Sequence, residues 1–344
     1  MSSPRLALFA VLMLAITAGT LADRPRPRPP IVIGGYRVLA VDFHTHSSMW
    51  SDGALTPWGL VLEAERQGLD AIAITGHNQV RDGRMGRWFS RLVGGPTVLP
   101  GEEILSDKNA YHLIAAGIHR MVSFQQSAAR AIDDIHRQGG IAIAAHPFPG
   151  SAGYDQAAMQ RLDGAEICHP MIYAVESGQR DLERFAARAP VAAIGSSDFH
   201  GIGTMGFCRT YVFVGDPSAS SGSPRASLID DTSAQAILDA VRAHRTVVYG
   251  RDGQAYGDPA LVRLADDDGR LRVAAPSNSR GGWLDWLSRI GGVLGLAGAI
   301  ALGPRRPPAR RLTAAGIRQS AALKLVKVTI QSTIAKGVCD GAHP

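Results

Sequence analysis

Residues 37–46 of the chain read RVLAVDFHTH, an apolar run that ends in two histidines. The run Arg37–Phe43 predicts a buried β-strand, because a short apolar stretch bounded by polar residues is typical of a strand inside a sheet. His44 and His46 follow at the end of that strand, where alternate side chains point to the same side. This stretch therefore predicts a buried strand that brings two ligand-type side chains to one place.

Similar apolar runs recur along the chain, and helical patterns separate them. The further predicted strands are 70–75, 97–99, 111–117, 141–145, 164–168, 191–195 and 246–249. The predicted helices are 56–68, with Thr56 as N-cap and Pro57 at the first position, 124–138, 176–188 and 233–244. Strands that alternate with helices favour an α/β fold with a parallel sheet or barrel.

Histidines and acidic residues gather at the ends and edges of these predicted strands. They are His44, His46, Asp52, His77, Glu103, His112, His146, Asp198 and His200. In a barrel the carboxyl ends of the strands share one mouth, so these side chains can converge. Histidine and carboxylate ligands without thiolates suit zinc, manganese or iron. A carboxylate such as Glu103 can bridge two ions, so the pattern predicts two or three divalent metal ions.

The charge of the chain is unevenly distributed. The flanks 1–30 and 283–344 hold 13 basic and 3 acidic residues, a sum of +10, whereas the body 31–282 holds 23 basic and 27 acidic residues, a sum of −4. A nucleic-acid-binding domain usually carries a basic patch on its folded body. The charge pattern therefore gives no reason to expect nucleic acid as a partner.

Both flanks contain apolar segments. Residues 1–22 predict a signal peptide or an uncleaved anchor, and the Arg/Pro-rich residues 23–30 predict an extended linker. Residues 283–303 have about the length of a transmembrane helix, with tryptophans at one end and arginines after the other, and they leave 304–344 as a basic cytoplasmic tail. The pattern predicts an exported, membrane-anchored protein with an extracytoplasmic catalytic domain. The alternative for 283–303 is an interfacial or hairpin helix.

The strand-end motifs are D-x-H-x-H from Asp42, S-D-G from Ser51, GLD-x-x-A-I-T-x-H-N from Gly68, P-G-x-E-I from Pro100, H-P from His146 and G-S-x-D-x-H from Gly195. Their set and order resemble the PHP (polymerase and histidinol phosphatase) domain, over about 38–200 and on to 249. The resemblance implies a distorted (β/α)7 barrel, TIM-like, within a domain that we place at 31–275. The segments 209–213 and 245–249 also look like the CehA/McbA branch, which includes ester- and carbamate-hydrolysing enzymes.

The resemblance also implies how the metal ligands divide. His44, His46, Glu103 and Asp198 would hold one ion. Glu103 would bridge to a second ion held with His112 and His146, and Asp52, His77 and His200 would hold a third. Gly76 departs from the family, which often has aspartate there, and the departure predicts a weaker orientation of His77.

These observations predict a metal-dependent hydrolase, first of all a phosphoesterase that uses a metal-activated hydroxide on a small-molecule substrate. Glu103, Asp198 and His200 are the candidate catalytic residues, and Arg81, Arg84 and Arg209 the candidate phosphate-binding residues. One alternative keeps the site but cleaves a carboxylic ester, carbamate or amide. Another is a degenerate barrel that serves as a binding module.

The cysteines exclude two further classes. Cys168, Cys208 and Cys339 form no CxxC pair, which argues against a disulfide scaffold and a thiolate zinc finger. A disulfide between Cys168 and Cys208 is left open. Glu166, within the predicted strand 164–168, is interpreted as a supporting or pocket-lining residue and not as a ligand.

Overall fold

The computed structural model describes residues 3–22, 29–147, 153–171, 177–215, 234–250, 252–272 and 283–301. The chain divides into two units, one formed by 23–280 and the other by 1–22 together with 281–344. Most of the predicted linker 23–30 and all of the predicted tail 304–344 lie outside the described residues.

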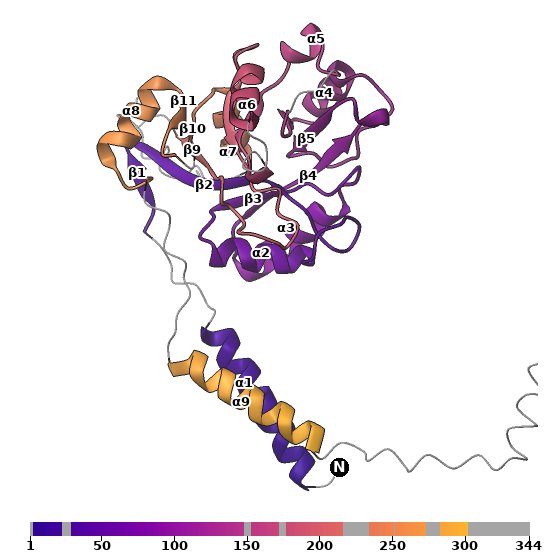
Figure 1. Ribbon diagram of the computed structural model, residues 1–344, viewed down its shortest axis with the longest axis vertical. Coiled ribbons are helices and arrows are strands. Elements are labelled where there is room, and N and C mark those ends of the chain that lie inside the picture. The colour runs from indigo at the N-terminus through magenta and orange to yellow at the C-terminus, as the bar shows by residue number, and fades with distance from the viewer. Residues whose placement is uncertain are drawn as a thin grey trace, which may run out of the picture. The chain divides into compact units, whose positions relative to one another are not determined.

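The described residues of the larger unit build one sheet around which the helices pack (Figure 1). Its strands are β1 (Ile31–Ile33), β2 (Tyr36–Thr45), β3 (Ala71–Ile74), β4 (Thr97–Leu105), β5 (His112–Ala116), β6 (Ile141–Ala144), β7 (Gly164–Cys168), β8 (Ala192–Gly195), β9 (Thr210–Val214), β10 (Thr246–Tyr249) and β11 (Ala255–Gly257). They follow the order β11-β10-β9-β2-β3-β4-β5-β6-β7-β8, and β1 pairs with β2.

The sheet is mixed. The β2–β3–β4 and β6–β7–β8 neighbours are parallel, as the alternating pattern predicts. In contrast, β5 runs antiparallel to both β4 and β6, and β9 runs antiparallel to β2 and β10. The prediction of a barrel-like α/β fold is confirmed, and the antiparallel strands are where it departs from a regular parallel barrel.

In the described part of the chain, no strand ladder joins β8 to β11, the two ends of the sheet. Thr210 ties β9 to β8, because its hydroxyl accepts the N–H of Gly195 and donates to the carbonyl of Gly195, both at 2.9 Å. Cys168, the last residue of β7, forms a disulfide with Cys208, and their Cα atoms lie 5.6 Å apart. The pairing left open by the sequence is thus present, and it links β7 covalently to the residues just before β9.

The helices of this unit are α2 (Pro57–Arg66), α3 (Arg81–Val93), α4 (Ala128–Arg137), α5 (Gln156–Met159), α6 (Gly178–Ala186), α7 (Ala234–Arg242) and α8 (Pro259–Asp268), with a short 3₁₀ turn η1 (Asp107–Asn109). The predicted start of α2 is confirmed, because the Thr56 side chain accepts the N–H of Gly59 at 3.1 Å. The apolar face of α7 packs into the barrel core beside Leu39 and Ile141, near the starts of β2 and β6. The opposite end of the barrel, where the parallel strands end, is left for polar side chains.

Helix α3, which begins at Arg81, is not among the helices predicted from the sequence. Gly83 and Gly86 weaken the helical signal in the sequence, since glycine is a poor helix former. In the structure both are buried. A Cβ at Gly83 would lie 2.6 Å from the Cα of Pro100, so the glycine lets α3 lie directly on β4.

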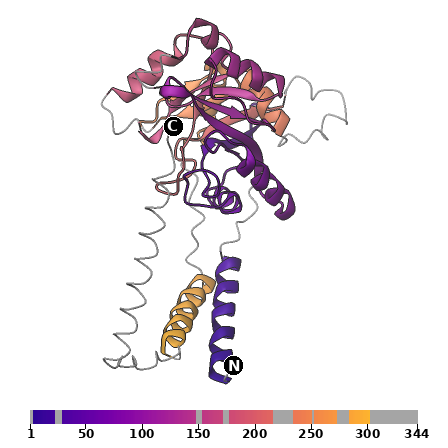
Figure 2. The ribbon, with the colours of Figure 1, turned by 90° about the vertical axis from the view of Figure 1, so that its right-hand side faces the viewer.

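The smaller unit consists of α1 (Ser3–Ala22) and α9 (Trp283–Ala301), which lie side by side in Figures 1 and 2. Small residues line their contact, and a Cβ at Gly291 would lie 2.9 Å from the Cβ of Ala15. Among the described residues, no helix combines the length and apolarity needed to cross a membrane. The membrane span predicted for 283–303 is not supported: residues 283–301 are helical, but Asp285, Arg289 and four glycines in that helix dilute its apolar character.

Candidate metal centre

The carboxyl end of β2 positions the first two ligand candidates. His44 and His46 are completely buried. The pairing of β2 with β3 shifts register between Asp42 and Thr45, and irregularities of this kind at barrel rims re-aim side chains. His146 and Asp198, which follow β6 and β8, adopt left-handed backbone conformations with φ of 26° and 48°. Such conformations cost roughly 1–3 kcal/mol each and cluster at functional sites.

The structure brings all nine predicted ligands together, in three groups whose ligand atoms lie within 4.8 Å of one another. The groups are His44, His46, Glu103 and Asp198; Glu103, His112 and His146; and His46, Asp52, His77 and His200. The first two match the division implied by the resemblance, and the third gains His46. A further group, His44, His146 and His169, contains a histidine that the sequence interpretation missed.

Glu103 lies between the groups and faces them with different oxygens. Its Oε1 lies 3.0 Å from Nδ1 of His112 and 3.1 Å from Nε2 of His146. Its Oε2 lies 3.2 Å from Nε2 of His44 and 3.1 Å from Nδ1 of His77. Burial by itself raises the pKa of Glu103, but His44 and hydrogen bonds from His112 and His146 outweigh it and hold the pKa well below its usual value. Glu103 is therefore an ionised carboxylate that turns one oxygen toward His112 and His146 and the other toward His44 and His77.

Buried partners fix the orientation of the histidines. Oε1 of Glu166 lies 3.0 Å from Nδ1 of His44, so Nδ1 donates to Glu166 and Nε2 is the ring nitrogen that faces Glu103 and Asp198. A carboxylate behind a ligand histidine is common in metal sites. Burial lowers the pKa of His46 to about 4, which keeps that ring neutral and able to ligate. Glu166 thus takes the supporting position that the sequence left among its possibilities.

Asp42 is a further buried residue that the sequence interpretation did not single out as part of the site. Its carboxylate accepts the N–H groups of Ser197 and Gly206 at 3.1 and 2.8 Å, and the hydroxyl of Ser197 also donates to it. These bonds connect β2 to the segment that carries Asp198. Asp42 therefore does not face the ligand groups itself. It helps to position Asp198 by binding the backbone of Ser197 before it and of Gly206 after it.

The space beside Gly76 is already filled. A Cβ at Gly76 would meet the side-chain amide of Gln79, and it would lie 3.0 Å from Cβ of Ser51 and 3.1 Å from Oδ2 of Asp82. Asp82 comes from the first turn of α3 and accepts hydrogen bonds from Ser47 and Gln79. A carboxylate thus reaches the neighbourhood of residue 76 from elsewhere in the chain.

The predicted substrate arginines lie in two different places. Arg81 and Arg84 are exposed on α3, and the described residues offer neither of them an ion-pair partner. Arg209 instead donates from Nε to the carbonyl of Gly206 at 2.9 Å and from Nη1 to that of Gln67 at 3.4 Å. Together with Arg37 and Tyr211, it lines a cavity of about 400 Å³. None of the nine predicted metal ligands lines that cavity. The structure therefore does not bring Arg209 into the ligand groups.

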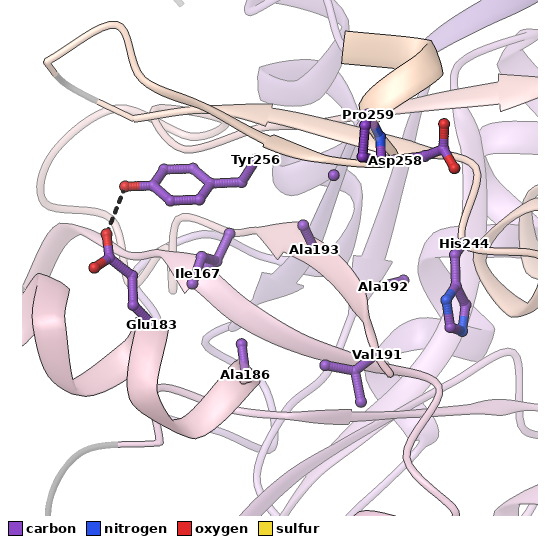
Figure 3. Close-up of a pocket in the computed structure, with 11 residues that line it drawn as sticks. Ile167, Glu183, Ala186, Val191, Ala192, Ala193, His244, Tyr256, Asp258 and Pro259 are labelled. Carbon is purple, nitrogen blue, oxygen red and sulfur yellow. Dashed lines mark hydrogen bonds between the residues drawn. The ribbon is translucent and has the colours of Figure 1, made fainter. Parts of the chain in front are cut away.

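A second cavity of about 400 Å³ opens between the end strands of the sheet (Figure 3). Ala192 and Ala193 of β8 line one side and Tyr256 of β11 the other, and the hydroxyl of Tyr256 donates to Glu183 at 2.8 Å. None of the nine ligand candidates lines it. The cavity marks the gap between β8 and β11 and is separate from the metal centre.

Comparisons with known proteins bear on the fold. No family model matches the sequence. An uncharacterized protein of Methanocaldococcus jannaschii is 27% identical over 141 residues, which cover 38% of this chain and 81% of that protein. A two-domain protein from Bacteroides vulgatus, described as containing a predicted PHP-like metal-dependent phosphoesterase, superposes with a TM-score of 0.55 at 22% identity, over 71% of this chain and 74% of that one.

PsfC from Pseudomonas syringae is 17% identical over 68% of this chain and 98% of its own, with a TM-score of 0.43. The likeness to the Bacteroides vulgatus structure shows that this chain shares the fold of a PHP-like protein. The resemblance seen in the sequence is supported to that extent.

Glu102 provides a prediction about pH. Its side chain is completely buried on the other side of β4 from Glu103, Oε1 accepts the N–H of Val122 at 2.6 Å, and burial raises its pKa to about 8. The folded protein therefore keeps a proton that the unfolded chain releases near pH 4.5. We expect the free energy of unfolding of the wild type to fall, relative to Glu102→Gln, by up to about 1.4 kcal/mol per pH unit from pH 5 to 8.

Urea unfolding of both metal-free proteins at pH 5 and pH 8 measures this difference. A gap between wild type and variant that stays the same at both pH values would contradict the protonated state of Glu102.

Proposed function

We propose that the chain is a metal-dependent hydrolase that acts on phosphoesters. The observation that carries the proposal is a set of buried ligand atoms that have no hydrogen-bond partner in the described part of the chain: Nε2 of His44, Nε2 of His46, Nδ1 of His77 and Oδ1 of Asp198. Buried polar atoms without partners are rare, because leaving them unpaired costs free energy. Four such atoms around one glutamate fit a site built for cations.

Divalent ions held by these residues would neutralise charge on a phosphoryl group and lower the pKa of a water molecule. The residues themselves determine where a substrate can approach. His44, His46 and Glu103 are at most 2% exposed, whereas the side chains of Asp52, His77 and His200 are 58%, 26% and 33% exposed. The ester would therefore enter from the side of Asp52 and His200.

Within this proposal, Glu103 and Asp198 hold and orient the ions, and His200 lies at the open edge of the centre. Nδ1 of His200 donates to the backbone carbonyl of Asp198 at 2.9 Å, and its Nε2 lies 3.2 Å from Oδ1 of Asp52. Arg81 begins α3 three residues after Asn78, so it and Arg84 are the candidates for binding a substrate phosphate. The exposure of both side chains leaves them able to reach an anionic ligand.

The test is a hydrolysis panel on the purified full chain, loaded with manganese or zinc. The panel pairs phosphomonoesters and phosphodiesters with an aryl ester and an aryl carbamate. We expect phosphate release in the wild type and its loss in Asp198→Ala, which controls for contaminating enzymes. Cleavage of the aryl ester or carbamate alone would instead favour the alternative chemistry of the CehA/McbA resemblance. Silence across the panel, with no metal retained, would favour a binding module.

A further inference from the structure

His169 is a buried histidine at the centre to which the sequence assigns no role. It directly follows β7 and is completely buried. Its Nδ1 accepts the backbone N–H of Met171 at 3.2 Å. Its Nε2 lies 3.5 Å from Oδ2 of Asp198 and 3.8 Å from Oε2 of Glu166, and it has no hydrogen-bond partner in the part of the chain that the structure describes.

The bond from Met171 determines the tautomer of this ring. A neutral imidazole has one nitrogen that donates and one that accepts. Because Nδ1 of His169 accepts a backbone N–H, the proton must be on Nε2. That nitrogen then has no lone pair for a metal ion, although His44, His146 and His169 bring ring nitrogens within 4.8 Å of one another. The tautomer therefore argues against a metal ion in this group of three histidines.

The carboxylate of Asp198 faces two sets of partners. Its Oδ1 lies 3.3 Å from Nε2 of His44 and 3.1 Å from Nε2 of His46, among the ligand atoms. Its Oδ2 lies on the side of His169. An N–H directed at Oδ2 would leave Oδ1 as the single oxygen available to an ion.

We propose that His169 is a positioning residue, whose Nε2–H donates to Oδ2 of Asp198 and so holds Oδ1 toward the ion shared with His44 and His46. This inference rests on the proposed function, since it requires a centre that holds metal. The present distance of 3.5 Å exceeds a normal hydrogen bond. We expect it to shorten on loading, as hydrogen bonds in unloaded active sites commonly do.

The experiment compares His169→Leu with His169→Gln in the full chain. Glutamine places its amide N–H the same number of bonds from Cγ as Nε2 of histidine and keeps the donor, whereas leucine removes it. Loss of such a supporting partner typically weakens metal binding by about 10- to 100-fold. We expect that loss for manganese or zinc in the leucine variant, measured by competition with a chelating indicator, and a Kd within about 3-fold of wild type in the glutamine variant. The electron paramagnetic resonance spectrum of bound Mn²⁺ should change in the leucine variant only.

A second pair of variants separates positioning from damage to the fold. If His169 acts through Asp198, His169→Leu should weaken metal binding little further once Asp198→Asn is present, because coupled residues are non-additive. Full additivity, or wild-type affinity in His169→Leu, would overturn the inference. Loss of an ion in both His169→Leu and His169→Gln would overturn it too, because His169 would then be a ligand. A wild-type chain that binds no metal would instead overturn the proposed function itself.

Discussion

Glu103→Gln is expected to remove metal from more than one position at once and to lower hydrolysis by on the order of 10²–10³-fold or more. The reason is the position of Glu103, whose two oxygens face different groups of histidines at 3.0–3.2 Å. Glutamine keeps the size of the side chain but replaces one charged oxygen with an N–H group, which cannot ligate a cation. Elemental analysis of the purified variant and its turnover of the best phosphoester substrate measure both effects.

The neighbouring residue supplies a matched control. Glu102→Gln makes the same chemical change one position earlier in β4, on a side chain that lies away from the ligand groups and is protonated near neutral pH. It should leave metal content and turnover near those of the wild type. Equal losses in the two variants would mean that strand β4, and not the bridging carboxylate, is what the substitution at 103 disturbs.

Removing the disulfide is expected to cause the second large effect. Cys168 and Cys208 are 40 residues apart, and a cross-link that closes a loop of that size stabilises a protein by about 4 kcal/mol in the chain-entropy model. The double variant Cys168→Ala, Cys208→Ala should therefore melt roughly 10 °C lower, at about 2–4 °C per kcal/mol for a domain of this size. Calorimetry of the two proteins measures the difference.

Reductant provides the control for this prediction. It should lower the melting temperature of the wild type toward that of the double variant and leave the double variant unchanged. Equal melting temperatures without reductant would show that the disulfide adds no stability. Because disulfides persist in oxidising compartments, we propose that the folded domain works outside the cytoplasm. A thiol count on unreduced protein tests whether the disulfide on which this proposal rests is formed.

Much of the centre could be located from the sequence, because its side chains follow apolar strands. His44 and His46 come directly after β2, and Asp198 and His200 come shortly after β8. Parallel strands bring such ends to one mouth, so a one-dimensional pattern is enough to predict that they converge. The apolar pattern did not predict the full length of β4, for which only residues 97–99 were expected. Pro100 and Gly101 suggest that a strand ends there, yet β4 continues to Leu105 and pairs with an antiparallel β5.

The residues that support the ligands could not be located in this way. Asp82 lies beside Gly76 only because α3 packs closely on β4 through buried Gly83, and glycine argues against a helix when the sequence is read alone. His169 is defined by one backbone N–H and by a carboxylate 29 positions further along the chain. Contacts of that kind form only in the completed fold, so they cannot be predicted from a local pattern of apolar and polar residues.

The unequal exposure of the ligands has a consequence for samples of this protein. The side chains of Asp52 and His200 are exposed to water, whereas those of His44 and Glu103 are buried. An ion at the outer group should exchange quickly with buffer and be stripped first by a chelator, while inner ions leave slowly. Dialysed preparations can therefore contain a fractional number of ions per chain although every molecule is folded alike, and their rates would then depend on handling history.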